Sequence, residues 1–172
     1  MIEYQRLNHE QAQREQASLC QVLANCVAEG ASVGFTDAAD LASMRRFWQG
    51  VIADIASGEK QLLVARKQGK IIGTVTVAIG MMPNGTHRAE IAKLLVNPDI
   101  RRQGVAYQLM KKAEIIALEA GKTLLVLDTR SGDIAEKLYV SLGWIVAGQI
   151  PGYARSTEGV LDATTIMYKW IK

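Results

Sequence analysis

The sequence has little of what disulfide-bonded and metal-binding proteins need. It holds two cysteines, Cys20 and Cys26, and two histidines in 172 residues. The cysteines fall in a segment with helical periodicity, and their spacing turns the two side chains away from each other, which argues against a disulfide. Because histidine is equally scarce and no paired cysteine spacing occurs, we expect no metal site of the common kinds.

Long apolar runs are also missing. No apolar run exceeds four residues, whereas a membrane-spanning helix needs about 20. The first six residues, MIEYQR, lack the apolar core of a secretory signal. The sequence therefore predicts no membrane partner and a cytoplasmic location.

What is present matches an ordinary globular chain. Hydrophobic residues make up 49% and charged residues 22%, and the length favours one domain spanning residues 1–172. The net charge of +3 suits a small anionic ligand but is too weak to indicate nucleic acid. A nucleic-acid-binding role for the basic residues of 101–112 is disfavoured, because Glu114 and Glu119 balance them and aromatic residues do not alternate with them.

Hydrophobic periodicity predicts secondary structure in the order β-α-α-β-β-β-α-β-α-β-β. We place strands at 2–7, 61–67, 70–79, 87–96, 123–127, 144–149 and 164–170, and helices at 10–29, 37–57, 105–120 and 133–142. This interspersed order predicts an α/β fold, in which one mixed sheet of about seven strands is flanked on both faces by four helices.

Several finer expectations follow from local patterns. The apolar run at 123–127 is typical of a strand buried on both faces. Asp133 and Glu136 have the spacing of a capping box at the start of a helix. A polar loop is expected at 151–162. Strand 164–170 could lie at an edge of the sheet and pair across a homodimer, so we expect either a monomer or a homodimer.

The segment 94–106 carries the clearest functional pattern. An apolar strand ends, a short loop follows, and a helix begins with the small residues Gly104 and Ala106. Such a loop can point several backbone N–H groups at one spot, where the positive end of the helix dipole adds to them, so it suits a phosphate group. The alternative is a plain strand-to-helix turn with the solvated pair Arg101 and Arg102.

The same segment resembles a known family. Arg101-x-x-Gly104-x-Ala106, which follows Pro98, is similar to the acetyl-CoA signature of the GNAT superfamily of N-acetyltransferases. A second segment, Ala135-x-x-Leu138-Tyr139-x-x-x-Gly143-Trp144, resembles that family's later motif, although Gly132 stands where many members carry asparagine. Loop segments such as Pro83-Asn84-Gly85 and Pro151-Gly152-Tyr153 further resemble the tabtoxin-resistance acetyltransferases.

The resemblance implies an acetyl-CoA-dependent enzyme that acetylates the primary amine of a small molecule, with amino-acid-like antimetabolites as the narrower possibility. A protein or peptide acetyltransferase and a non-catalytic CoA-binding module are the alternatives. The residues implied to bind acetyl-CoA are Leu94, Leu95, Val96, Arg101, Arg102, Gln103, Gly104, Val105, Ala106 and Tyr107. A backbone N–H near Val96 would stabilise the oxyanion.

Acetyl transfer also needs a base for the amine and an acid for the thiolate. Glu90 and Asp128 are the candidate bases, while the resemblance makes Tyr139 the acid. Each has a structural alternative: an ion pair with Arg88 or Lys93 for Glu90, a turn or cap for Asp128, and a core aromatic for Tyr139.

Loops are the expected position of the acceptor site. We expect the amine substrate to contact Ser32, Phe35, Asn84, Arg88 and Tyr153. If the substrate carries a carboxylate, Arg88, Arg155 or His87 could receive it.

Overall fold

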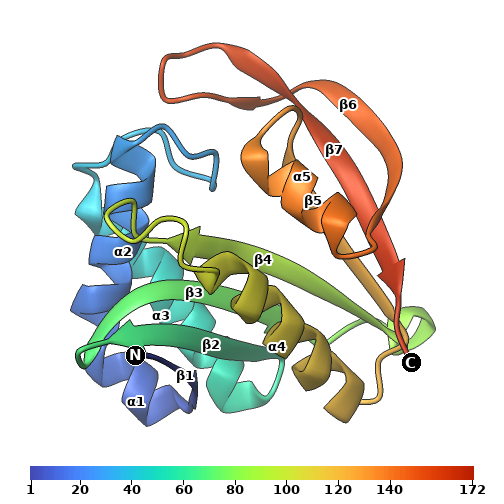
Figure 1. The fold of residues 1–172 in the computed structure, drawn as a ribbon. Helices are drawn as coiled ribbons and strands as arrows, with labels where there is room; N and C mark the ends of the chain where they lie inside the picture. The colour runs from blue at the N-terminus through green and yellow to red at the C-terminus, as the bar shows by residue number, and fades with distance from the viewer.

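The computed structural model describes all 172 residues and is built on one mixed sheet of seven strands (Figure 1). The strands lie in the order β1-β2-β3-β4-β5-β7-β6. Their bounds are β1 Ile2–Leu7, β2 Lys60–Lys67, β3 Lys70–Ala78, β4 Arg88–Val96, β5 Leu124–Arg130, β6 Ile145–Arg155 and β7 Leu161–Trp170. The helices are α1 His9–Arg14, α2 Gln16–Ala28, α3 Leu41–Ser57, α4 Val105–Glu119 and α5 Ile134–Ser141. The predicted α/β class and the seven strands are confirmed.

One pairing in the sheet differs from all the others. Strands β4 and β5 run parallel, and their pairing stops after three residue pairs, the last of which joins Glu90 to Val126. Beyond that point the two strands continue without pairing, while β5 stays paired with β7 to its end. The sheet therefore opens between β4 and β5, and Figure 1 shows β5, β6 and β7 leaning away from the rest of the sheet.

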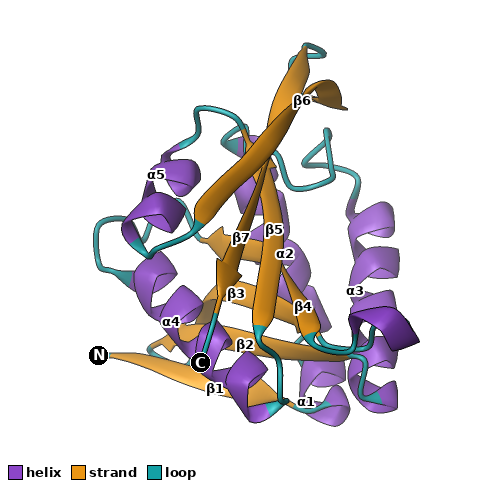
Figure 2. Cartoon of the chain, turned by 90° about the vertical axis from the view of Figure 1, so that its right-hand side faces the viewer, coloured by secondary structure: helices purple, strands orange, loops and turns teal.

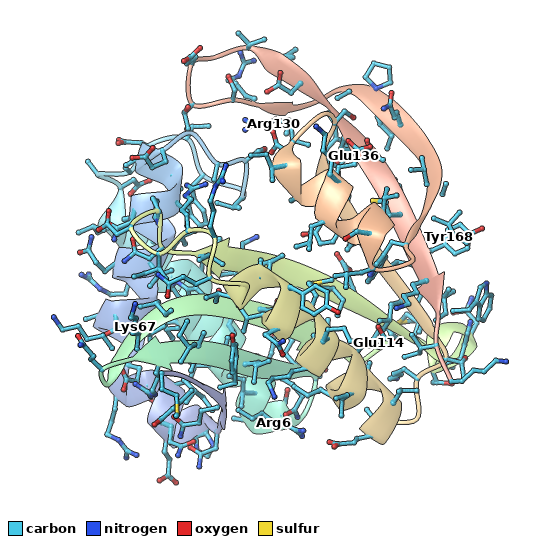
Figure 3. The ribbon with its side chains drawn as sticks, in the orientation of Figure 1. Arg6, Lys67, Glu114, Arg130, Glu136 and Tyr168 are labelled. Carbon is cyan, nitrogen blue, oxygen red and sulfur yellow. The ribbon has the colours of Figure 1, made fainter.

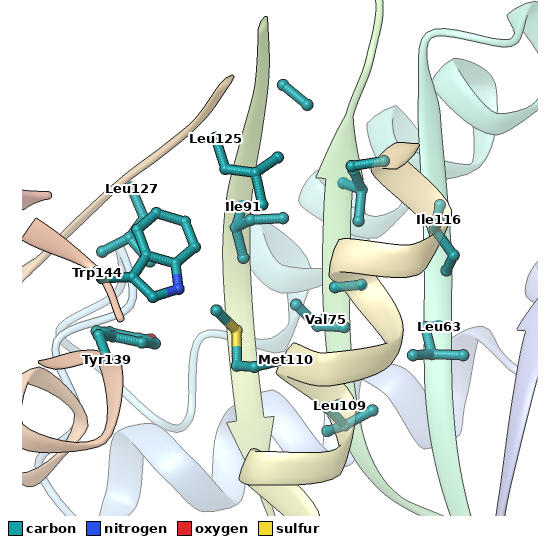
Figure 4. Packing of buried hydrophobic residues seen from close by; sticks show 14 of the residues in the cluster. Leu63, Val75, Ile91, Leu109, Met110, Ile116, Leu125, Leu127, Tyr139 and Trp144 are labelled. Atoms are coloured by element: carbon teal, nitrogen blue, oxygen red, sulfur yellow. The ribbon is translucent and has the colours of Figure 1, made fainter. Parts of the chain in front are cut away.

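Helices cover the sheet on two faces (Figure 2). Helices α4 and α5 pack on one face, where 19 buried residues form a cluster that includes Leu109, Leu127 and Trp144 (Figure 4). Helices α1, α2 and α3 pack on the other face over a second cluster of 17 buried residues, with Trp48 fully buried. None of the five helices combines the length and the hydropathy that a bilayer crossing requires.

The expectation of four helices is wrong by one, because the helix predicted at 10–29 divides at Glu15. This residue leaves helical geometry, with φ −96° and ψ 8°, and its carboxylate pairs with Arg66 at 3.0 Å. The helix predicted from residue 37 begins at Leu41 instead, because Asp40 is its N-cap and accepts a hydrogen bond from the Ser43 N–H.

Two local expectations around β5 and α5 are also wrong. Strand β5 is not buried on both faces: Leu125 and Leu127 are buried against α4 and α5, whereas their neighbours are half-buried or exposed. The Asp133 and Glu136 capping box does not form. The Asp133 carboxylate accepts a hydrogen bond from Arg130 Nε instead, and the Glu136 carboxylate accepts one from the Gly132 N–H (Figure 3).

The C-terminal hairpin is longer than predicted. Much of the loop expected at 151–162 belongs to strands β6 and β7, which leave a connection of five residues, 156–160. Strand β7 lies between β5 and β6, so the prediction that it forms an edge is wrong. The edge strand at this end of the sheet is β6, which pairs only with β7 and whose residues are almost all exposed.

Candidate active site

A cleft opens where β4 and β5 diverge. Its volume is about 360 Å³. One wall comes from β4 and the α2–α3 loop, and the other from β5, α5 and the β6–β7 hairpin. The lining includes Ser32, Gly34, Ile91, Lys93, Leu94, Leu127, Asp128, Arg130, Asp133, Tyr139, Tyr153 and Thr164. Segments distant in sequence thus meet around one opening in the sheet.

A β-bulge shapes the β4 wall of the cleft. Lys93 has φ +52°, and the register with β3 shifts between Thr74 and Thr76. The two threonines hold the bulge, because their buried hydroxyls donate to the carbonyl oxygens of Lys93 at 2.8 Å and of Ala92 at 2.9 Å. The bulge also reverses the alternation of side chains. Leu94, beyond the bulge, packs on the α4 face, whereas Glu90, before it, is exposed.

The loop after β4 presents a row of free backbone donors. None of the N–H groups from Arg101 to Tyr107 has an acceptor within the protein, and α4 has no side-chain N-cap. Gly104 precedes the helix with φ +72°. The side chains of Arg101 and Arg102 are exposed. This combination of free N–H groups and a helix N-terminus fits the pyrophosphate of acetyl-CoA.

Asp128 enters the cleft from β5. Because Leu125 and Leu127 face α4 and α5, Asp128 points to the opposite face of the sheet. Its Oδ2 lies 2.8 Å from Thr164 Oγ1, which donates a hydrogen bond to it from the adjacent strand β7. Asp128 is therefore held by β7 as well as by its own strand, and it is not a cap of the following helix.

Tyr139 enters the cleft from the other face. Its ring belongs to the cluster beneath α4 and lies 6.1 Å from the Trp144 ring, yet the residue also lines the cleft (Figure 4). Burial raises the pKa of Tyr139, and the negative charges of Asp128 and Asp133 raise it further. The phenol is therefore protonated at neutral pH and can act as a proton donor.

Glu90 lies outside this constellation. It is exposed on β4, in the last residue pair before the strands diverge, and is not among the residues lining the cleft. The ion pair with Arg88 or Lys93, which we considered as its structural role, does not form.

The five expected acceptor residues are divided by the fold. Ser32 and Tyr153 line the cleft, whereas Phe35 packs edge-on against Phe47 at 5.8 Å. Asn84 and Arg88 lie at the beginning of β4, away from the end where the cleft opens. Neither His87 nor Arg155 lines the cleft, and Arg155 donates a hydrogen bond to the Gly159 carbonyl within the hairpin turn.

Sequence reasoning missed Lys93 and Thr164 as parts of the cleft. In the sequence, Lys93 is one charged residue in a strand of alternating polarity. Only the bulge directs its side chain to the wall of the cleft. Thr164 is one of several threonines in β7, and only its pairing with β5 places it beside Asp128. No cluster of three or more His, Cys, Asp or Glu side chains suited to a metal ion occurs in the protein.

A family model connects this geometry to known proteins. The model of the acetyltransferase (GNAT) family matches residues 20–144, which include the β4–α4 loop, Asp128 and Tyr139. The chain therefore belongs to the GNAT acetyltransferase family. It is an acetyltransferase, and acetyl-CoA is its co-substrate.

Solved structures share the whole fold. The yncA protein of Salmonella typhimurium, solved with acetyl-CoA, has a TM-score of 0.80 at 18% identity, covering 100% of this chain and 95% of that one. A ribosomal-protein-alanine N-acetyltransferase from Brucella melitensis has a TM-score of 0.78 at 16% identity, with coverages of 98% and 99%. A structure named as a phosphinothricin N-acetyltransferase has a TM-score of 0.80 at 17% identity, with coverages of 100% and 99%. The acceptors in these names differ, so the shared fold leaves the acceptor open.

Proposed function

We propose that the protein transfers the acetyl group of acetyl-CoA to the primary amine of a small molecule. Amino-acid-like antimetabolites are the narrower class, which would make the protein a toxin-resistance enzyme. One observation carries the proposal: the cleft between β4 and β5 brings Asp128 and Tyr139 together from opposite faces of the sheet. In this proposal residues 1–172 act as one cytoplasmic domain, as a monomer or a homodimer.

Asp128 is the proposed base. An amine attacks only as the free base, so its ammonium must first lose a proton. The Asp128 carboxylate takes this proton directly or through one water molecule, while Thr164 keeps the carboxylate oriented toward the cleft. The amine nitrogen then forms a bond to the thioester carbonyl carbon, and a backbone N–H near Val96 is the proposed donor to the oxyanion.

Tyr139 is the proposed acid. When the tetrahedral intermediate collapses, the carbon–sulfur bond breaks and the departing thiolate needs a proton. The buried phenol supplies it, because its raised pKa keeps it protonated at neutral pH. The proton that Asp128 took from the ammonium passes to solvent. The attacking nitrogen loses a second proton as the amide forms, and this proton restores the phenol through water. The products are the acetamide, the CoA thiol and one proton released to solvent.

The shape of the cleft supports a small acceptor. Its volume of about 360 Å³ falls in the usual range for small-molecule sites, roughly 300–1,000 Å³. The α2–α3 loop and the β6–β7 hairpin both contribute to its walls. An extended peptide needs an open groove, so a cleft walled by these two segments favours a small acceptor.

The test is CoA release from acetyl-CoA across a panel of small amines and short peptides, followed with a thiol reagent. We expect small amines to be acetylated. Asp128→Asn should lower kcat by about two to four decades and leave acetyl-CoA affinity in calorimetry unchanged. Glu90→Gln tests the other candidate base in the same assay. Glu3→Gln, on the edge strand β1 at the opposite end of the sheet, is the matched control and should keep the wild-type kcat.

The outcomes separate the alternatives. If Glu90→Gln loses the activity and Asp128→Asn keeps it, Glu90 is the base. Preference for the peptides would establish a protein acetyltransferase instead. Acetyl-CoA binding without turnover of any amine would leave a non-catalytic CoA-binding module.

A further inference from the structure

Lys93 is a cation in the cleft for which the transfer mechanism has no role. Its side chain reaches from the bulge of β4 toward α3 and the α2–α3 loop. Its Nζ lies 4.9 Å from the centre of the Phe47 ring, and a Cβ at Gly34 would lie 3.7 Å from the same atom. The ammonium is thus enclosed by an aromatic face on one side and by a glycine turn on another.

This ammonium has no anionic partner within the protein. No carboxylate oxygen lies within 4.0 Å of Nζ, and no hydrogen bond from Nζ is made. Burial lowers the pKa of Lys93, while the charge of Asp128 across the cleft raises it. A cation that is largely removed from water and lacks an ion pair is unfavourable, so an anion entering the cleft would be stabilised there.

The backbone at Lys93 is held in a conformation that favours glycine. Its φ of +52° is unfavourable for a residue with a Cβ, and the Thr74 and Thr76 hydroxyls fix the carbonyls of Lys93 and Ala92, on either side of the Lys93 Cα. The bulge therefore directs this particular side chain into the cleft. Strain kept at a position that lines a ligand cleft is typical of a functional role.

We propose that Lys93 binds the carboxylate of the acceptor and so selects amino acids over simple amines. The cleft then offers a zwitterion two complementary charges: Asp128 receives the ammonium that must lose its proton, and Lys93 receives the carboxylate. This inference rests on the proposed function. It assigns the carboxylate to a residue other than Arg88, Arg155 or His87, none of which lines the cleft.

The experiment compares L-α-amino acids with their own carboxamides, which keep the amine and side chain but lack the carboxylate. The wild-type protein should prefer the acids by at least about tenfold in kcat/KM. Lys93→Met, which keeps the length and removes the charge, should bring this preference below about threefold by lowering kcat/KM for the acids alone. Lys93→Arg should retain most of the preference, and Lys111→Met, on the exposed surface of α4, should match the wild type.

A second readout does not depend on activity. Because Lys93→Met removes an unpaired cation from a partly buried position, its melting temperature should equal or exceed that of the wild type. Its acetyl-CoA affinity should be unchanged.

Failure of this inference is distinguishable from failure of the proposed function. Equal use of acids and carboxamides by the wild type, or an unchanged preference in Lys93→Met, overturns the role of Lys93 alone. No acetylation of either panel overturns the proposed function, and the role of Lys93 with it.

Discussion

Gly73 controls how closely α4 seats on the sheet. It lies on β3 opposite Val96, directly under the first turns of the helix that follows the acetyl-CoA loop. A Cβ at this position would lie 3.0 Å from the Leu95 carbonyl oxygen, 3.2 Å from Val105 Cγ1 and 3.2 Å from Leu109 Cδ1. The carbonyl belongs to a paired strand and cannot retreat, so in Gly73→Ala the helix has to move outward.

The expected cost follows from these three contacts. Overpacking of a well-packed core by a small group costs about 1–3 kcal/mol. For a chain of 172 residues, 1 kcal/mol corresponds to roughly 2–4 °C in Tm, so Gly73→Ala should melt about 2–12 °C lower than the wild type. Because the helix N-terminus moves with the helix, acetyl-CoA affinity should fall as well.

Thermal unfolding followed by circular dichroism checks the first effect, and calorimetric titration with acetyl-CoA checks the second. Gly50→Ala is the matched control, because Gly50 is exposed in α3 with nothing within 4 Å of its added Cβ. This control should gain roughly 0.5–1 kcal/mol from improved helix propensity. A Gly73→Ala protein that melts within about 1 °C of the wild type would show that the α4 interface is looser than these distances indicate.

Four further predictions concern Tyr139, Cys26 and Lys169. Tyr139→Phe should lower kcat by about two decades or more. Burial raises the pKa of Tyr139 in the folded state above that of the unfolded chain. The protonated phenol therefore stabilises the fold fully below about pH 10, and this stabilisation is lost as the pH rises above that value. In urea unfolding, the free energy of unfolding should therefore fall more between about pH 9 and about pH 11 for the wild type than for Tyr139→Phe. Burial raises the pKa of Cys26 to about 11, so this thiol should stay unreactive toward a disulfide reagent at about pH 8 until the protein unfolds. Lys169→Met removes the 2.8 Å ion pair between Lys169 and Glu114, two side chains that are only 19% and 23% exposed. This change should lower the free energy of unfolding in urea by about 1–3 kcal/mol. Arg6→Met, at a more exposed pair, should cost less than about 1 kcal/mol.

The candidate acetyl-CoA loop could be proposed from sequence because its signal is local. A strand, a short loop and a helix that starts with small residues are contiguous in the chain, and the free N–H groups between Arg101 and Tyr107 follow from the end of a helix. Asp128 is a candidate base from sequence alone, because ligands collect where the strands of an open α/β sheet end. Both conclusions needed no knowledge of which strands are neighbours.

The departures from expectation have a local and a distant source. The capping box does not form, because the carboxylates of Asp133 and Glu136 accept hydrogen bonds from other donors nearby, Arg130 and Gly132. The division of the first helix at Glu15 coincides with an ion pair to Arg66, which is 51 positions further along the chain, and local propensity does not contain that partner.

The sequence by itself determined the fold class, the seven strands, and the two motifs that lead to the GNAT family. These features can be read from hydrophobic periodicity and short-range spacing, which lie within contiguous segments and do not depend on tertiary contacts. Only the tertiary structure decided which side chains meet in the cleft. The parting of β4 from β5 and the bulge at Lys93 depend on hydrogen bonds between strands, and these bonds turn Lys93 inward, leave Glu90 outside and set Thr164 beside Asp128. Since a shift of one residue in strand register reverses every side chain that follows, the set of side chains that face the cleft depends on strand pairing and cannot be read from alternation alone.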